Sequence, residues 1–256
     1  MKIFIGIVVV FVLAILVMFY ATSGMTNTAD AFFAAVKDKN IALARSYLSE
    51  DFKASTDEKT LQDFLTRKTL IKFKKASWSN RQISGGRGEL TGSITTESGG
   101  TVPIKLELIK ENGNWLIYSI YKPEAGIIAE ESGKAPSERE EVALINESME
   151  TFAQSVNAKD FSEFYGYISN LWRRQISTQK LNEIFKPFMD RDINLLVLKN
   201  FSPIFDGQPT LDDNGILTIK GRYPTKPSSV MFEFSYVYEG TGWKLIGARV
   251  NIQPSS

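Results

Sequence analysis

A short turn that occurs twice constrains the fold of this chain more than any other feature of its sequence. It reads Glu-Asn-Gly-Asn-Trp at residues 111–115 and Glu-Gly-Thr-Gly-Trp at residues 239–243. Each copy follows one strand-like run and precedes another, and glycine-containing pairs between such runs are typical of β-hairpins. Each half of the chain is therefore predicted to end in an antiparallel hairpin.

The turn belongs to a longer internal repeat. Apolar residues in the predicted helices of the first half align with apolar residues 120 positions later in the second half. In the predicted strands this offset is 128, because the second half contains an insertion of eight residues. The aligned pairs are Phe32 with Phe152, Val36 with Val156, Lys39 with Lys159, Ile41 with Phe161, Leu61 with Leu181, Ile104 with Phe232, Leu106 with Phe234, Leu108 with Tyr236, and Trp115 with Trp243. Because two copies are too few for a solenoid, the repeat predicts two tandem domains.

Periodicity and turn residues predict the elements and their boundaries. The expected helices are residues 28–39, a second helix capped by Asn40, and a third opened by the capping-box pair Ser55 and Glu58. Residues 78–95 are expected to form two strands joined by a glycine turn at 85–88, and residues 102–110 and 115–121 are expected to form one strand each. Ser137 with Glu140 is a second capping box, which predicts a new helix. The resulting divisions are an anchor at 1–25, a first domain at 26–122, a linker at 123–137 and a second domain at 138–256.

Three short helices followed by a twisted antiparallel sheet that ends in a polar-Gly-x-Trp turn resemble the nuclear transport factor 2-like superfamily, the cystatin-like cone. Phe32, Phe33 and Phe152, with the turns at 112–115 and 240–243, carry the resemblance. The predicted fold class is α+β: an N-terminal transmembrane helix followed by two tandem cone-shaped domains, each of about three helices packed on a curved antiparallel sheet. The superfamily includes enzymes, ligand binders and structural modules, so the resemblance does not fix the function.

Residues 3–20 form an uninterrupted apolar run. Eighteen helical residues span about 27 Å, close to the roughly 30 Å hydrocarbon core of a bilayer. The run is longer than the apolar region of a signal peptide, and residues 21–24 form only a partly suitable cleavage site, so an uncleaved single-pass anchor is favoured over a cleaved signal. Lys2 precedes the run, which predicts a cytoplasmic N-terminus and an extracytoplasmic chain, periplasmic or extracellular.

Composition excludes several kinds of chemistry. The chain has no cysteine and no histidine, so disulfides, thiolate nucleophiles, zinc–thiolate sites and histidine-dependent triads are excluded. The formal net charge is +1, so no overall field favours nucleic acid. We predict no cofactor, no metal and no nucleic-acid partner.

Strand alternation and local charge give two candidate sites. Inward-facing aromatic residues of the second domain predict a pocket for a flat apolar ligand, lined by Tyr165, Phe232, Phe234, Tyr236, Tyr238 and Trp243. A basic cluster of the first domain predicts contact with anionic lipid head groups, through Arg67, Lys68, Lys72, Lys74 and Lys75. The alternative interpretations are a packed aromatic core and a solvated helix end. In the first domain, the inward residues Ile104, Leu106 and Leu108 predict a filled core.

These features predict a non-catalytic binding or scaffold protein, an accessory subunit of an envelope assembly with protein partners or further copies of itself. Its architecture resembles the bitopic assembly subunits of type IV secretion and conjugation machines, although only Met1 and Lys2 precede the apolar run. One alternative is a binder of a small apolar ligand in the second domain. Another is an isomerase- or dehydratase-type enzyme, which requires a carboxylate facing Tyr165 or Tyr236. Residues 212–215, Asp-Asp-Asn-Gly, are predicted to form a hairpin turn and not a calcium site.

Overall fold

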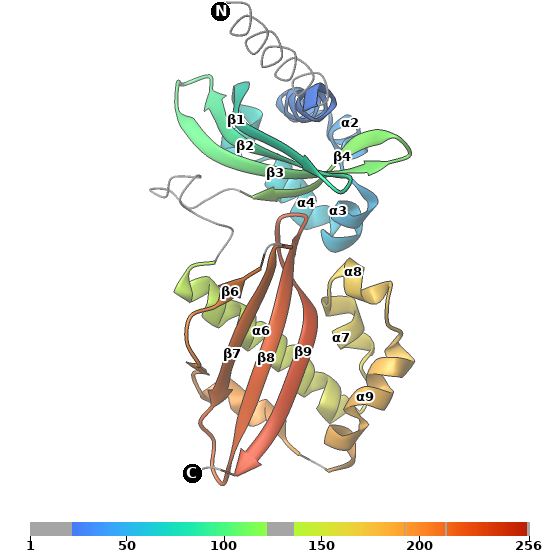
Figure 1. Ribbon diagram of the computed structural model, residues 1–256, viewed down its shortest axis with the longest axis vertical. Helices are drawn as coiled ribbons and strands as arrows, with labels where there is room; N and C mark the ends of the chain where they lie inside the picture. Colours follow the sequence, from blue (N-terminus) through green and yellow to red (C-terminus); the bar gives the residue numbers. More distant parts are fainter. Residues whose placement is uncertain (1–21, 122–135, 192, 213, 255–256) are drawn as a thin grey trace, which may run out of the picture. The chain divides into compact units, whose positions relative to one another are not determined.

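The computed structural model describes residues 22–121, 136–191, 193–212 and 214–254 (Figure 1). The predicted anchor at residues 3–20 and most of the predicted linker lie outside these residues. The chain divides into two compact units, Met1–Gly133 and Lys134–Ser256, and the division falls inside the predicted linker. Each unit combines helices with an antiparallel sheet, so the predicted α+β class is confirmed. Among the helices of the described ranges, none is long and apolar enough to cross a membrane.

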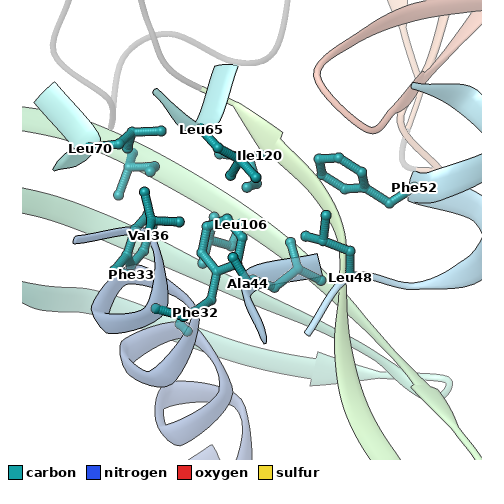
Figure 2. Packing of buried hydrophobic residues seen from close by; sticks show 14 of the residues in the cluster. Phe32, Phe33, Val36, Ala44, Leu48, Phe52, Leu65, Leu70, Leu106 and Ile120 are labelled. Carbon is teal, nitrogen blue, oxygen red and sulfur yellow. The ribbon is translucent and has the colours of Figure 1, made fainter. Parts of the chain in front are cut away.

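The first unit opens with a helix at residues 22–37 and ends in a four-stranded antiparallel meander of order β1-β2-β3-β4. Its other elements are α2 (Ile41–Ser46), α3 (Glu50–Ser55), α4 (Glu58–Leu65), α5 (Lys68–Ile71), β1 (Phe73–Ser84), β2 (Arg87–Thr96), β3 (Thr101–Glu111) and β4 (Asn114–Tyr121). Figure 2 shows Phe32, Phe33 and Val36 of the first helix in one cluster with Leu106 and Ile120 of the sheet. The inward positions of β3 are buried as predicted, which closes this core.

The short helices of the first unit begin where side chains cap them. The Asn40 side chain accepts the backbone N–H of Leu43, as predicted. The prediction that Ser55 opens the next helix is wrong, because Ser55 is the last residue of α3. Asp57 caps α4 instead, since its carboxylate accepts the backbone N–H of Thr60 at 2.9 Å. The sequence therefore concealed one extra short helix, α3.

The strands begin earlier than periodicity predicted, because β1 starts at Phe73 and not at residue 78. The predicted glycine turn joins β1 to β2, with φ of 56° at Gly85 and 81° at Gly86. Two consecutive positive φ values are those of a type I′ hairpin, which suits the right-handed twist of the strands. Asp212 and Ile216 lie at the two ends of the other predicted turn, where the Asp212 carboxylate accepts the backbone N–H of Ile216 at 2.7 Å.

The second unit is built on a long helix, α6, which crosses one face of its sheet (Figure 1). Its elements are α6 (Glu138–Ala158), α7 (Ser162–Tyr167), α8 (Asn170–Arg173), α9 (Thr178–Asp190), the 3-10 helix η1 (Leu195–Asn200), β5 (Ile204–Phe205), β6 (Thr210–Leu211), β7 (Ile216–Tyr223), β8 (Ser228–Glu239) and β9 (Gly242–Pro254). The predicted capping box starts α6, because the Glu140 carboxylate accepts the Ser137 backbone N–H at 2.8 Å. The sheet order is β5-β7-β8-β9, with β6 also paired to β7.

The two units differ most before their last three strands. Where the first unit has the 12-residue strand β1, the second has two strands of two residues each, β5 and β6. The second unit also has a longer helix, since α9 has 13 residues and α4 has eight, and η1 follows it. The insertion inferred from the change of offset therefore lies in this stretch.

Equivalent hydrogen bonds join helix to sheet in both units. The backbone N–H of Ser49 donates to the carbonyl of Ile117 at 2.9 Å, and that of Ser169 donates to the carbonyl of Leu245 at 2.7 Å. The serines differ in number by 120 and the carbonyls by 128, as the two offsets require. Both serines are fully buried, and both side chains cap the helix that follows.

The glutamate of the repeated turn completes this junction. Glu239, fully buried, accepts the backbone N–H of Asn170 at 2.9 Å and that of Leu171 at 3.1 Å. Glu111, which is half-buried, accepts the backbone N–H of Glu50, with oxygens at 3.2 and 3.4 Å from the nitrogen. The turn thus stabilises the first turn of a helix through its own carboxylate. This explains why a glutamate precedes the glycine in both copies.

Candidate functional site

A cavity of about 380 Å³ lies in the second unit between α6 and η1. Its lining consists of Asn146, Met149, Glu150, Ala153 and Gln154 from α6, Leu195, Leu196, Leu198 and Lys199 from η1, and Tyr223 from β7. We call it the α6–η1 cavity. Its volume falls within the range of about 300–1,000 Å³ that small-molecule sites occupy. In the first unit, the hollow between Phe64 and Ile120 measures only about 20 Å³, roughly the space of one water.

The α6–η1 cavity lies where the two units differ in side-chain volume at positions that the sequence offsets align. In the first unit Phe33 is fully buried and stacks on Phe73, with ring centroids 5.4 Å apart. The offsets of 120 and 128 set these residues opposite Ala153 and Phe201. Ala153 lines the cavity, and Phe201 is 40% exposed. The second unit therefore lacks the aromatic pair that fills this part of the first.

A hydrogen bond between buried Tyr223 and exposed Asn146 fixes the polar groups on one side of the cavity. The Tyr223 hydroxyl donates to Asn146 Oδ1 at 2.9 Å, and Tyr223 itself is only 1% exposed. Burial raises the pKa of Tyr223, so the phenol stays protonated at neutral pH. Because the amide oxygen is used by Tyr223, the Asn146 amide nitrogen is left to donate to a ligand.

Two charged side chains stand at the cavity on different elements. Glu150 of α6 accepts a long hydrogen bond from Gln154 Nε2 at 3.4 Å. Lys199 of η1 is exposed, and its ammonium makes no ion pair or hydrogen bond with any residue that the structure describes. The cavity therefore combines an aliphatic wall with a few polar groups, an arrangement that suits binding of a small molecule.

A second buried polar group lies deeper in the same unit. Ser148 Oγ is 2.9 Å from the hydroxyls of both Tyr167 and Tyr236, and the Tyr236 hydroxyl donates to the carbonyl of Leu144 at 3.2 Å. Each hydroxyl has one proton, so all three bonds form when Tyr167 donates to Ser148 and Ser148 donates to Tyr236. Burial raises the pKa of Tyr236 well above its usual range, although the Ser148 hydrogen bond opposes the shift. These phenols are neutral hydrogen-bonding groups at physiological pH and do not act as bases.

The structure places most of the predicted pocket residues in the hydrophobic core. Phe232, Phe234 and Tyr236 share the inward face of β8 and are buried, and Tyr238 is buried on the same face. None of the six predicted residues lines the α6–η1 cavity. Tyr165 donates from its hydroxyl to the carbonyl of Arg173 at 3.3 Å. Trp243 packs edge-to-face on Tyr238, with ring centroids 5.3 Å apart, and is half-buried.

Residues of the predicted basic cluster lie at the junction of α4, α5 and β1. Arg67 is exposed and lies over the Phe64 ring, 5.3 Å from its centroid. Lys68 begins α5, and Lys72, Lys74 and Lys75 are exposed around the start of edge strand β1. The structure thus brings most of the cluster to one end of the sheet, and its contact with lipid stays a prediction. Throughout the described ranges, no group of three or more carboxylates is arranged to hold a metal ion.

No protein-family profile matches this sequence, and comparison with curated proteins finds no relative. Comparison with solved structures finds an NTF2-like protein of unknown function from Cytophaga hutchinsonii, with 19% identity, coverage of 36% of this chain and 84% of that chain, and a TM-score of 0.25. It also finds a cystatin-like protein from Ruminococcus gnavus, with 8% identity, coverage of 93% and 96%, and a TM-score of 0.30. Both descriptions name the fold that the sequence resembles. Likenesses this distant do not establish a family, so membership stays a prediction.

Proposed function

We propose that this chain is a non-catalytic binding protein whose second unit holds a small ligand in the α6–η1 cavity. The observation that carries the proposal is the cavity itself, about 380 Å³ in a unit whose aligned partner is filled by Phe33 and Phe73. Five aliphatic or thioether side chains line it together with five polar or charged ones, so it offers both apolar contact and groups that can orient a ligand. The proposed ligand site is not the predicted pocket on the aromatic face of β8, because the residues of that face pack in the hydrophobic core.

The experiment fills the cavity and asks whether binding is lost. Ligand-detected NMR is used to screen small molecules against the full chain in lipid nanodiscs, and every hit is repeated with Ala153→Phe. The added ring occupies the position that Phe33 takes in the first unit, so we expect the hits to lose binding. Ile184→Phe is the matched control, because Ile184 is 49% exposed on α9 and does not line the cavity. If no compound is lost selectively in Ala153→Phe, the proposal is wrong.

We further propose that the two units are tandem copies of one domain. The support is the pair of equivalent junctions, in which Ser49 and Ser169 bond to β4 and β9 and a turn glutamate accepts N–H groups of the following helix. These contacts recur at the offsets read from the sequence. In this proposal the two copies have different roles, because the first is a packed structural module and the second binds the small ligand.

Residues 3–20 are proposed to anchor the chain in a membrane, with both units outside the cytoplasm. The apolar length of the run is what supports this proposal. The mass of the mature protein purified from membranes tests it, because a chain that begins near residue 24 has lost the run and is not anchored by it.

A further inference from the structure

We propose that the α6–η1 cavity takes an anionic single-chain amphiphile, with its alkyl chain inside the cavity and its carboxylate at Lys199. This inference rests on the proposed function and adds the chemical class of the ligand. Three features carry it: the five aliphatic or thioether side chains of its wall, the Lys199 cation that has no partner among the described residues, and the exposed apolar residues on and after η1.

The wall of the cavity suits a flexible chain better than a flat ring. Its apolar members are aliphatic or thioether side chains: Met149, Ala153, Leu195, Leu196 and Leu198. Tyr223 is the one aromatic residue among the ten described residues of the lining, and its hydroxyl is held by Asn146. Recognition of a flat ring favours aromatic faces, whereas an alkyl chain needs apolar area of adaptable shape.

The charges at the cavity select the head group. Lys199 has no partner in the described part of the chain, so a ligand carboxylate can take its ammonium as a new ion pair without displacing another group. The Asn146 amide nitrogen provides a further donor. Glu150 already accepts a hydrogen bond from Gln154, and its charge opposes an anionic ligand. Lys199 therefore favours an anionic ligand and Glu150 opposes it. Neutralising each residue in turn should change the affinity in opposite directions, and this reveals the charge of the ligand.

Exposed apolar residues continue from η1 into the chain that follows. Val197 of η1 is 43% exposed, Phe201 directly after η1 is 40% exposed, and Ile204, the first residue of β5, is 43% exposed. Exposed apolar groups on and after the element that forms one wall offer contact area to the tail of an amphiphile leaving a lipid layer. Exposed apolar residues would not help a small hydrophilic ligand to bind, because such a ligand enters from water.

The test uses three photoreactive probes of equal chain length, an alkyl diazirine ending in a carboxylate, an ammonium or a hydroxyl group. Each is added to the full chain in nanodiscs of zwitterionic lipid, and labelling of peptides from residues 149–154 and 195–199 is measured by mass spectrometry. We expect the carboxylate probe to label these peptides. Lys199→Gln should lower its yield about two- to fivefold, the range expected for one partly exposed ion pair, and Glu150→Gln should raise it. Comparing variants with one probe cancels its partitioning into lipid.

The outcomes separate this inference from the proposed function. The ammonium or hydroxyl probe could label the cavity, with a yield that Ala153→Phe abolishes and Lys199→Gln leaves unchanged or raises. In that case the cavity binds ligands, but the anionic class of ligand is wrong. The same conclusion follows if Glu150→Gln weakens labelling by the carboxylate probe. If no probe labels these peptides, the alkyl-chain ligand is excluded, and the wider proposal then depends on the NMR screen. Hydrogen exchange of α6 outside the cavity confirms that each variant is folded.

Discussion

Replacing the turn glutamate by glutamine should weaken the two units very unequally. Glu239→Gln keeps the shape of the side chain but removes its charge and turns one acceptor oxygen into an NH₂ group. The fully buried carboxylate accepts two backbone N–H groups, at 2.9 Å from Asn170 and 3.1 Å from Leu171. After the substitution one of these N–H groups faces a donor, and the other loses a charge-assisted bond.

The expected size follows from these contacts. A hydrogen bond to a charged group contributes about 1.5–3 kcal/mol, and a buried N–H left without an acceptor costs about 1–3 kcal/mol. Relief of the buried charge offsets part of this loss, so we expect a net destabilisation of about 2 kcal/mol. Glu111→Gln is the matched control: it bonds Glu50 at 3.2 and 3.4 Å, is half-buried, and retains an acceptor after the change. Its expected cost is below about 0.5 kcal/mol.

Hydrogen-exchange mass spectrometry of the full chain measures both effects in one sample, because peptides report on each unit separately. A loss of about 2 kcal/mol speeds exchange of the protected amides of β8 and β9 about thirtyfold. The strands of the first unit should change less than about threefold in Glu111→Gln. Equal effects in the two units, or an increase below about threefold in Glu239→Gln, would falsify the stabilising role of the buried turn carboxylate.

Three further predictions concern single positions. Phe33→Ala should destabilise the first unit by about 3–5 kcal/mol, whereas Ala153→Phe should stabilise the second by about 0.5–2 kcal/mol; thermal unfolding followed by exchange in each unit checks both signs. Burial raises the pKa of Tyr236, so its contribution is complete below about pH 10 and falls by about 1.4 kcal/mol per pH unit above it, where only the unfolded phenol ionises. Tyr236→Phe should lower the slope of an alkaline unfolding series, followed by tyrosinate absorbance, by this amount and leave the contributions of Tyr167 and Tyr223, whose pKa values burial also raises. Lys39 and Lys159 have φ of 57° and 55° at helix C-termini. Glycine at either position should raise the free energy of unfolding of its unit by about 0.5–1 kcal/mol, measured by urea unfolding. A lower free energy of unfolding would contradict the view that these lysines are strained.

The sequence predicted the features that depend on local chemistry. Asn40 caps its helix, Gly85 and Gly86 take positive φ, and Glu140 closes the capping box of α6, because each needs only residues a few positions apart. The error at Ser55 has the same origin. The Ser55/Glu58 pair fits a local pattern, but Ser55 is the last residue of α3 and Asp57 caps α4.

The candidate site was harder to predict, because hydrophobic patterns count apolar residues and do not measure their volume. Phe33 and Ala153 are both apolar at aligned positions, so the pattern scores them alike. The alternation of β8 located an aromatic face correctly, but a face that is buried on every side is core, as Phe234 shows at 0% exposure. The insertion before β7 was visible as a change of offset, and nothing in its composition shows that η1 forms a cavity wall.

Comparison of the two units at aligned positions supplies what each unit alone cannot. Residues that agree between them, such as Ser49 with Ser169 and Glu111 with Glu239, make the same bonds in each unit and therefore serve the fold. A residue that differs in volume at an aligned buried position changes the space available, and Ala153 opposite Phe33 is such a difference at the wall of the α6–η1 cavity. A chain without histidine or cysteine has few reactive side chains to mark a site. In such a chain the missing ring is the better signal, because it lies at the wall of a hollow of about 380 Å³. The test of function therefore begins by filling that hollow.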